Sequence, residues 1–182
     1  MTTATLLQTG TWTLDPAHTV IGFVARHLMV TKVRGGFASF TGAINLGDTP
    51  ETSSVEVSID TASFGSGAAD RDGHIRSADF LDVENHPAIT FRSTAVRALG
   101  RDEYEIDGDL RIKDVTRPVT LATTFEGVQG DPWGGTRAGF TAATTINRED
   151  WGLTWNVPLD GGGVLVGKEI KIEIEVEAVL AS

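Results

Sequence analysis

Apolar and polar residues alternate with a period of two along most of this chain. In the clearest case, KEIKIEIEVEAVL near the C-terminus, Ile170, Ile172 and Ile174 alternate with lysine and glutamate. The stretches SSVEVSIDTASF, YEIDGDLRIKD and AGFTAATTINRED repeat this pattern. Successive side chains of a strand point to opposite faces, so each stretch predicts a strand with one apolar and one polar face. No strong amphipathic helix pattern occurs, and the chain is therefore predicted to be all-β.

About eight strands are expected, which is the size at which an antiparallel barrel encloses one small ligand. A two-sheet sandwich fits the same alternation, so the pattern alone leaves both architectures open. Phe37 and Phe40 stand three residues apart in one expected strand, and a bulge is needed to place both inside. The chain of 182 residues is expected to form a single domain over 1–182, in which residues 1–10 are a loose leader.

One segment, RDGHIRSADFLDVENHPAITF at residues 71–91, breaks the alternation by mixing charges, histidines and apolar residues. It predicts a short helical connection around residues 71–86, with its turns near Ile75 to Leu81. Loops on a rigid scaffold often carry function, so this segment is a candidate site. Its charged side chains either latch the helix or contact a ligand, and the sequence leaves both interpretations open for Arg71, Asp72, Arg76 and Asp79.

The composition narrows the function classes. The formal net charge of -10 argues against nucleic-acid binding and against more than transient contact with an anionic membrane. Cysteine is absent, which excludes disulfides and thiolate sites. The first residues, MTTATLLQTG, lack the basic start and long apolar core of a secretory signal, so a cytoplasmic location is expected.

The sequence carries little sign of catalysis. The four histidines lie in separate segments without zinc spacing, and neither a nucleophile elbow nor a phosphate-binding loop occurs. No metal site, cofactor or catalytic set is predicted. The alternative that stays open is an enzyme acting on a lipid-like substrate, with His27 or His74 as general acid or base.

Inward-facing apolar positions make a binding interior the better-supported hypothesis. Many small residues at inward positions indicate space left unfilled, although any single apolar residue could simply fill a core. The predicted ligand-binding residues of the interior are Phe23, His27, Phe37, Phe40, Ile59, Phe80, Ile89, Phe91, Leu110, Ile112, Phe140 and Ile146. Those of the charged segment are Arg71, Asp72, His74 and Arg76. Trp151 and Trp155 either close the bore or pack beneath it, and packing is the favoured interpretation.

Several segments, taken in order, resemble one known family. They are WTLDPAHTVIGFVARHLMVTKVRGGFASFTGAINL from Trp12, RD-x-H-x-R-S-x-D-F at 71–80, HPAITFRST at 86–94, YEIDGDLRIKDVTRPV at 104–119 and GFTAATTINREDWGL at 139–153. Together they resemble the YceI-like, polyisoprenoid-binding, lipocalin-like proteins. The resemblance implies an eight-stranded antiparallel barrel with a long isoprenoid or similar amphiphile in its pore. Many members of that family look secreted or periplasmic, whereas no signal peptide is seen here.

This resemblance implies that the protein carries or stores a polyisoprenoid lipid, of the isoprenoid quinone or polyprenyl phosphate type. An anionic or quinone-like head group is expected to meet Arg71, His74 and Arg76, with Asp72 orienting one of them. A stress-response barrel with a filled core and no ligand is a further alternative. Whether the protein is a monomer or a homodimer is left open by the sequence.

Overall fold

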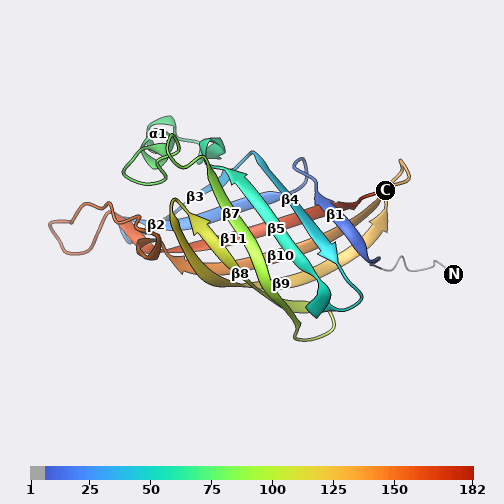
Figure 1. The fold of residues 1–182 in the computed structure, drawn as a ribbon. Helices are drawn as coiled ribbons and strands as arrows, with labels where there is room; N and C mark the ends of the chain where they lie inside the picture. Colours follow the sequence, from blue (N-terminus) through green and yellow to red (C-terminus); the bar gives the residue numbers. More distant parts are fainter. Residues whose placement is uncertain (1–6) are drawn as a thin grey trace.

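The computed structural model describes residues 7–182 and shows a closed β-barrel with a short helix at one end (Figure 1). Its strands are β1 (Gly10–Leu14), β2 (Val20–His27), β3 (Thr31–Phe37), β4 (Phe40–Leu46), β5 (Ser54–Asp60), β6 (Phe64–Gly65), β7 (Ala88–Ala98), β8 (Glu103–Ile112), β9 (Val115–Gly130), β10 (Thr136–Asn147) and β11 (Val166–Leu180). The helices are η1 (Pro50–Thr52), η2 (Thr61–Ser63), α1 (Ala69–Arg76) and η3 (Arg148–Trp151).

Eight strand positions close the barrel, in the order β1-β4-β5-β7-β8-β9-β10-β11, and β1 pairs back with β11. The three remaining strands prolong members of this ring. β11 pairs with β1 through Ala178–Leu180 and with β2 through Val166–Glu175, so β1 and β2 are two halves of one bent strand. β3 and β4, and β5 and β6, are related in the same way. The predicted eight-stranded antiparallel barrel is therefore confirmed, and the sandwich alternative is wrong.

The bends explain how irregular spacings fit into a regular barrel. β3 ends at Phe37 and β4 begins at Phe40, and the two residues between them interrupt the strand. Phe40 is buried and Phe37 packs against the same core. The irregularity expected between Phe37 and Phe40 is therefore present. It is a break between β3 and β4 and not a bulge within one strand.

The helical connection lies earlier in the chain than expected. α1 spans Ala69–Arg76, and Ser77 ends it by donating from both its amide and its hydroxyl to the carbonyl of His74. The residues that follow form turns, in which the amide of His86 donates to the carbonyl of Asp82. The helical turns expected near Ile75 to Leu81 were therefore placed too late, because the Ser77 cap stops the helix first.

The expected leader falls partly outside the described residues, which begin at Leu7. Leu7 packs against the core, and the carbonyl of Gln8 accepts a hydrogen bond of 3.0 Å from Trp12 Nε1. β1 begins at Gly10. The last residues before β1 are therefore in contact with the barrel.

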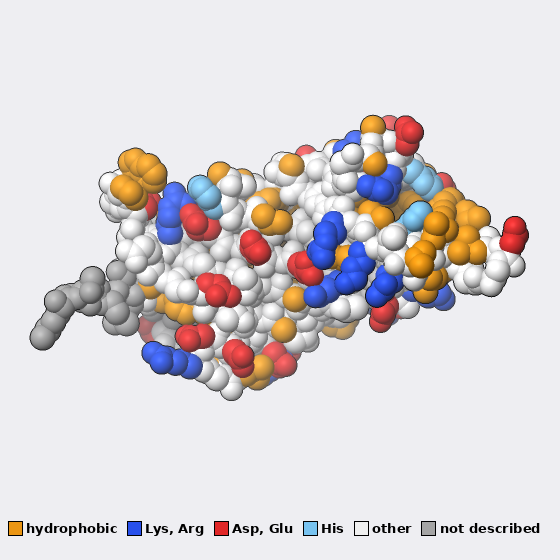
Figure 2. Space-filling view, turned by 180° about the vertical axis from the view of Figure 1, so that it is seen from behind, with side chains coloured by type: hydrophobic (Ala, Val, Ile, Leu, Met, Phe, Trp, Pro, Cys, Tyr) orange, Lys and Arg blue, Asp and Glu red, His pale blue; other side chains and the backbone are white. Residues whose placement is uncertain are grey.

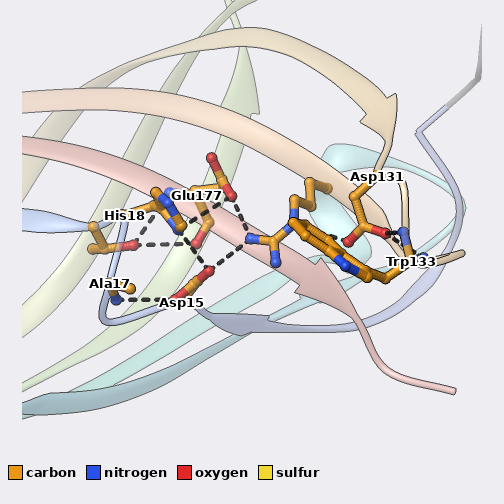
Figure 3. A network of polar contacts seen from close by, with 9 residues as sticks. Asp15, Ala17, His18, Asp131, Trp133 and Glu177 are labelled. Carbon is orange, nitrogen blue, oxygen red and sulfur yellow. Dashed lines mark hydrogen bonds and ion pairs between the residues drawn. The ribbon is translucent and has the colours of Figure 1, made fainter.

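A network of charged side chains fastens the bend between β1 and β2 to the neighbouring strands (Figure 3). Arg137 of β10 donates to Asp15 Oδ2 at 2.6 Å, to Asp131 Oδ2 at 3.0 Å and to Glu177 of β11. Asp131 also accepts from the amides of the β9–β10 turn. One guanidinium thus ties the bend to the turn that connects β9 with β10.

Hydrogen bonds lower the pKa of two carboxyls in this network. His18 and then Arg137 hold the pKa of Asp15 far below its usual value, and the amide of Gly135 and then Arg137 lower that of Asp131. A carboxyl whose pKa is lower in the folded than in the unfolded state stabilises the fold above its unfolded pKa. That contribution is lost as the pH falls towards the folded pKa.

We predict that acid weakens this barrel through the Arg137 network. The free energy of unfolding should stay level from neutral pH to about pH 4. Below that pH it should fall, because the carboxyls of the unfolded state begin to bind protons while those of the folded state stay ionised. Arg137→Gln should lower stability at pH 7 and make the acid loss shallower, because Asp15 and Asp131 then titrate closer to their unfolded values. Urea denaturation from pH 7 to pH 3 measures both, and equal acid slopes in the two proteins would contradict the prediction.

Candidate functional site

The barrel encloses a cavity of about 470 Å³, within the range of small-molecule sites. Inward-facing aliphatic and aromatic side chains from strands all around the ring form its wall. At one end the lining is formed by residues outside the strands, namely residues 7–9 and, between β4 and β5, residues 47–50 and Ser53. We call this end the mouth.

Polar groups are concentrated at the mouth. Gln8, Thr9, Asp48, Thr49 and Ser53 lie there, whereas the other polar side chains of the wall are hydroxyls. Among the described lining residues, Asp48 is the only acid, and no lysine, arginine or histidine is present. The cavity therefore suits a long apolar body with a weakly polar end.

Small residues keep the bore open. Ala142 and Thr144 occupy inward positions of β10 where a larger side chain would fill space. Gly108 acts differently, because a Cβ at this position would lie 2.3 Å from the Phe91 ring on the neighbouring strand. Phe91 can therefore lie against the wall at Gly108.

Three phenylalanine rings narrow the interior towards α1. Phe64 is fully buried, and its ring centroid lies 5.2 Å from that of Phe23 and 5.6 Å from that of Phe37. A Cβ on Gly35 would stand 2.9 Å from Phe23 and 3.0 Å from Phe64, so only glycine admits this packing without a shift. We call the end of the barrel beyond these rings the closed end.

Arg148 organises the closed end. Its guanidinium is buried and donates to the carbonyls of Leu153 at 2.6 Å, Trp155 at 3.0 Å, Gly167 at 3.0 Å and Val166 at 3.3 Å. Burial lowers the pKa of Arg148. A single cation thus gathers the long connection between β10 and β11 onto the barrel.

Two tryptophans pack at the closed end, in agreement with the expectation for both. Trp151 is buried and donates to the carbonyl of Leu110 at 3.0 Å. The ring of Trp155 meets those of His74 and Phe80, with centroids 4.4 Å and 5.4 Å away. Phe80 in turn lies 5.7 Å from the guanidinium carbon of Arg148.

The polar side chains of α1 form hydrogen bonds with neighbouring residues of the same segment. Arg71 donates to the hydroxyl of Ser66 at 2.7 Å and to its carbonyl at 3.0 Å, and that hydroxyl donates to the buried carboxylate of Asp72. The Ser66 hydroxyl is also the main reason that the pKa of Asp72 is lowered. These contacts latch the connection between β6 and α1.

His74 and Arg76 also have partners within the closed end. His74 Nε2 lies 2.8 Å from Asp79 Oδ2, and Arg76 donates to the carbonyl of Phe64. The Nε of Arg76 is buried without a hydrogen-bond partner among the described residues. Neither residue lines the cavity.

The predicted ligand-binding residues divide into four groups. Those that line the cavity are Phe23, Phe37, Ile59, Ile89, Phe91, Leu110, Ile112 and Phe140. Phe40, Phe80 and Ile146 are buried in the core beyond the lining. His27 ends β2, half-buried, and Arg71, Asp72, His74 and Arg76 lie in α1. Ligand contact by any of them stays a prediction.

Other lining residues were not among the predicted ones, including Val55, Val57, Ile106, Leu121, Ile174 and Val176. The alternation that marks strands places each of them on an inward face, so this signal was available. The mouth residues 47–50 lie in a loop, where no periodicity points to them.

One group of possible metal ligands occurs among the described residues. Asp15, His18 and Glu177 offer ligand atoms within 4.8 Å of one another. Arg137 already donates to both carboxylates, and its single positive charge offsets part of theirs. This group belongs to the network that fastens the bend between β1 and β2.

A closed antiparallel barrel of eight strands around an apolar cavity has the architecture of a lipocalin-like binding protein. Residues 12–178 match the family model of the YceI-like domain, and the chain belongs to this family. None of the described helices is long and apolar enough to cross a membrane.

Comparison with known sequences agrees with this assignment, and comparison with solved structures agrees with the fold. A UPF0312 protein of Azotobacter vinelandii is 44% identical over 137 residues, which cover 75% of this chain and 71% of that protein. The crystal structure of Burkholderia cenocepacia BcnA has a TM-score of 0.77 at 22% identity, covering 90% of this chain and 98% of the other. A polyisoprenoid binding domain from Saccharophagus degradans has a TM-score of 0.72 at 14% identity, covering 96% and 100%.

Arg148→Lys should destabilise the protein by about 2 kcal/mol or more, because an ammonium cannot reach four carbonyls spread around a planar guanidinium. Arg117→Lys is the matched control, since Arg117 is exposed and donates to one carbonyl, that of Asp150, at 3.3 Å. We expect the control to change stability by less than about 0.5 kcal/mol. Urea denaturation compares the two variants, and equal midpoints would show that Arg148 lacks the organising role described here.

Proposed function

We propose that this protein binds the tail of a polyisoprenoid or a similar amphiphile in the barrel cavity, and carries or stores that lipid. The observation that carries the proposal is a cavity of about 470 Å³ with an apolar wall and polar groups at its mouth. The name of the Saccharophagus degradans domain, which has the same fold, supports the same ligand class.

Physical chemistry makes such a barrel a carrier and not a trap. Moving a tail from water into the cavity gains about 0.8 kcal/mol for each buried CH₂. Moving it from a bilayer gains little, because the bilayer core is already apolar. The lipid is therefore protected from water, yet it can return to a membrane at small cost.

Binding is better supported than catalysis on a lipid-like substrate. A general acid or base must come within about 3 Å of the reacting atom. His27 and His74 both lie outside the cavity lining, and His74 faces Asp79 and two aromatic rings at the closed end. Neither histidine is thus in place to reach a tail in the bore.

We further propose that the head group lies at the mouth and is neutral, as in an isoprenoid quinone. Asp48 is the one charged side chain among the described lining residues, and a phosphate there would meet a like charge. Thr49 and Ser53 offer hydroxyls that can hydrogen-bond a carbonyl or an alcohol. The α1 cations Arg71 and Arg76, which the sequence analysis expected to meet the head group, lie at the closed end with partners of their own.

Native mass spectrometry of the purified protein, followed by extraction and identification of what it releases, is the direct test. A polyisoprenoid or related amphiphile is expected to co-purify or to bind on incubation. Ala142→Phe should weaken binding by about 2 kcal/mol, roughly thirtyfold, because the new ring displaces two or three methylene groups of the tail.

Ala143→Phe provides the matched control, since Ala143 neighbours Ala142 on β10 but does not line the cavity. It should leave lipid affinity unchanged. A protein that stays free of lipid after incubation with polyprenols, polyprenyl phosphates and quinones would overturn the proposed function. An equal loss of lipid affinity in the two variants would show that the tail does not bind in this cavity.

The head-group proposal makes a separate prediction. At equal tail length, a polyprenol should bind more tightly than its phosphate, and Asp48→Asn should narrow that difference. Arg71→Ala and His74→Ala should leave the selectivity unchanged. Competition binding with the two lipids measures this preference. A phosphate preference that Arg71→Ala removes would instead place the head group at α1.

A further inference from the structure

The turn between β2 and β3 has an unusual combination of residue type and backbone. Leu28 and Met29 have φ angles of 51° and 61°, and the amide of Val30 donates to the carbonyl of His27 at 3.1 Å. These are the features of a type I′ hairpin turn, for which asparagine and glycine are strongly preferred. Two large apolar residues here strain the backbone, and such strain clusters at functional sites.

The same residues are exposed to solvent. The exposed fractions are 41% for Leu28, 54% for Met29, 73% for Val30 and 42% for Val157. The amide of Leu28 donates to the carbonyl of Leu165 at 2.8 Å, which places the connection between β10 and β11 beside the turn. We call these four residues the tip; Figure 2 shows hydrophobic side chains gathered at this end of the molecule, beside basic ones.

Two basic residues, Arg26 and Lys32, lie next to the tip on β2 and β3, although the whole chain has a net charge of -10. Arg26 pairs directly opposite Lys32 across β2 and β3, an arrangement of like charges that weakens a sheet. Within residues 7–182 neither side chain forms an ion pair. The only acidic residue in the adjacent loop 156–165 is Asp160.

Three features that each cost the isolated protein stability thus coincide at the tip. They are the apolar residues with left-handed backbone, the exposed apolar surface, and two facing basic residues without an acidic partner. An apolar patch next to basic side chains fits the boundary between lipid head groups and acyl chains. A second copy of this chain fits less well, because a twofold contact through the tip would bring the same basic residues together.

We propose that the tip docks this protein on a bilayer that contains anionic lipid. The four apolar side chains enter the head-group boundary, and Arg26 and Lys32 contact lipid phosphates. The tip belongs to the closed end, opposite the mouth, so docking does not depend on what the cavity holds. A docked barrel presents its mouth away from the membrane surface.

Flotation with vesicles of phosphatidylcholine, with and without phosphatidylglycerol, tests this proposal. The protein should bind vesicles that contain phosphatidylglycerol, and salt should weaken that binding. Leu28→Asn with Met29→Gly should reduce the binding at least about tenfold, because it removes the central apolar pair. The double variant should still fold, because it supplies the residues that a type I′ turn prefers.

Charge variants and a control complete the design. Arg26→Gln and Lys32→Gln should each lower affinity for the anionic vesicles by about fivefold. Trp133→Ser should leave binding unchanged, although Trp133 is 85% exposed, because it lies in the β9–β10 turn at the mouth end. Absence of binding to the anionic vesicles would overturn the proposal, and so would equal binding by the Leu28/Met29 variant.

Sedimentation of the same variants identifies the competing occupant. If the wild-type chain forms a dimer that the Leu28→Asn, Met29→Gly change dissociates, while neither protein binds vesicles, the tip contacts a second copy and the membrane proposal fails. Lipid extraction on the same samples keeps the two proposals apart, because cavity occupancy should not change with the tip.

Discussion

The buried guanidinium of Arg148 is the contact on which the closed end depends. Four carbonyls surround it, and within residues 7–182 no carboxylate is among its hydrogen-bond partners. Buried charge is costly unless its hydrogen bonds are satisfied, and here the backbone satisfies them. Because the connection from β10 to β11 is gathered in this way, Trp151 and Trp155 can pack at the closed end.

An open bore forgoes the dispersion contacts that a filled core would provide. The ring of strands compensates through its closure, since a closed barrel leaves no free edge and pairs its backbone groups throughout. The pairing of β1 with β11, which closes the ring, is its weak point, because β1 is short and bends into β2. Arg137 and its three carboxylates stabilise that bend. Hydrogen bonding around the ring thus supports an interior that is free to take a ligand.

The eight-stranded closed barrel followed from the alternation together with the resemblance of ordered segments, and part of the cavity wall followed as well. Alternation tells inside from outside, so it identified Ile59, Ile89 and Leu110. It does not tell a lining residue from one buried beyond the lining, which is why Phe40 and Ile146 had the same pattern as Phe91. The charged segment was predicted to contact a ligand because of its side chains. The partners of those side chains, such as Ser66 for Asp72, depend on folded contacts that sequence spacing does not reveal.

The two ends of the described chain lie side by side. β1 pairs with β11, and beyond the last paired residues the amide of Ala181 donates to the carbonyl of Thr11 at 2.8 Å. A short linker could therefore join the two ends of the described chain. A circular permutant that joins these ends and opens the chain at the β9–β10 turn would keep every ladder of the ring. It would also carry both of its new ends next to the joined old ones, because Arg137 after this turn pairs with Val179, so a reporter fused there would stay at this end of the barrel.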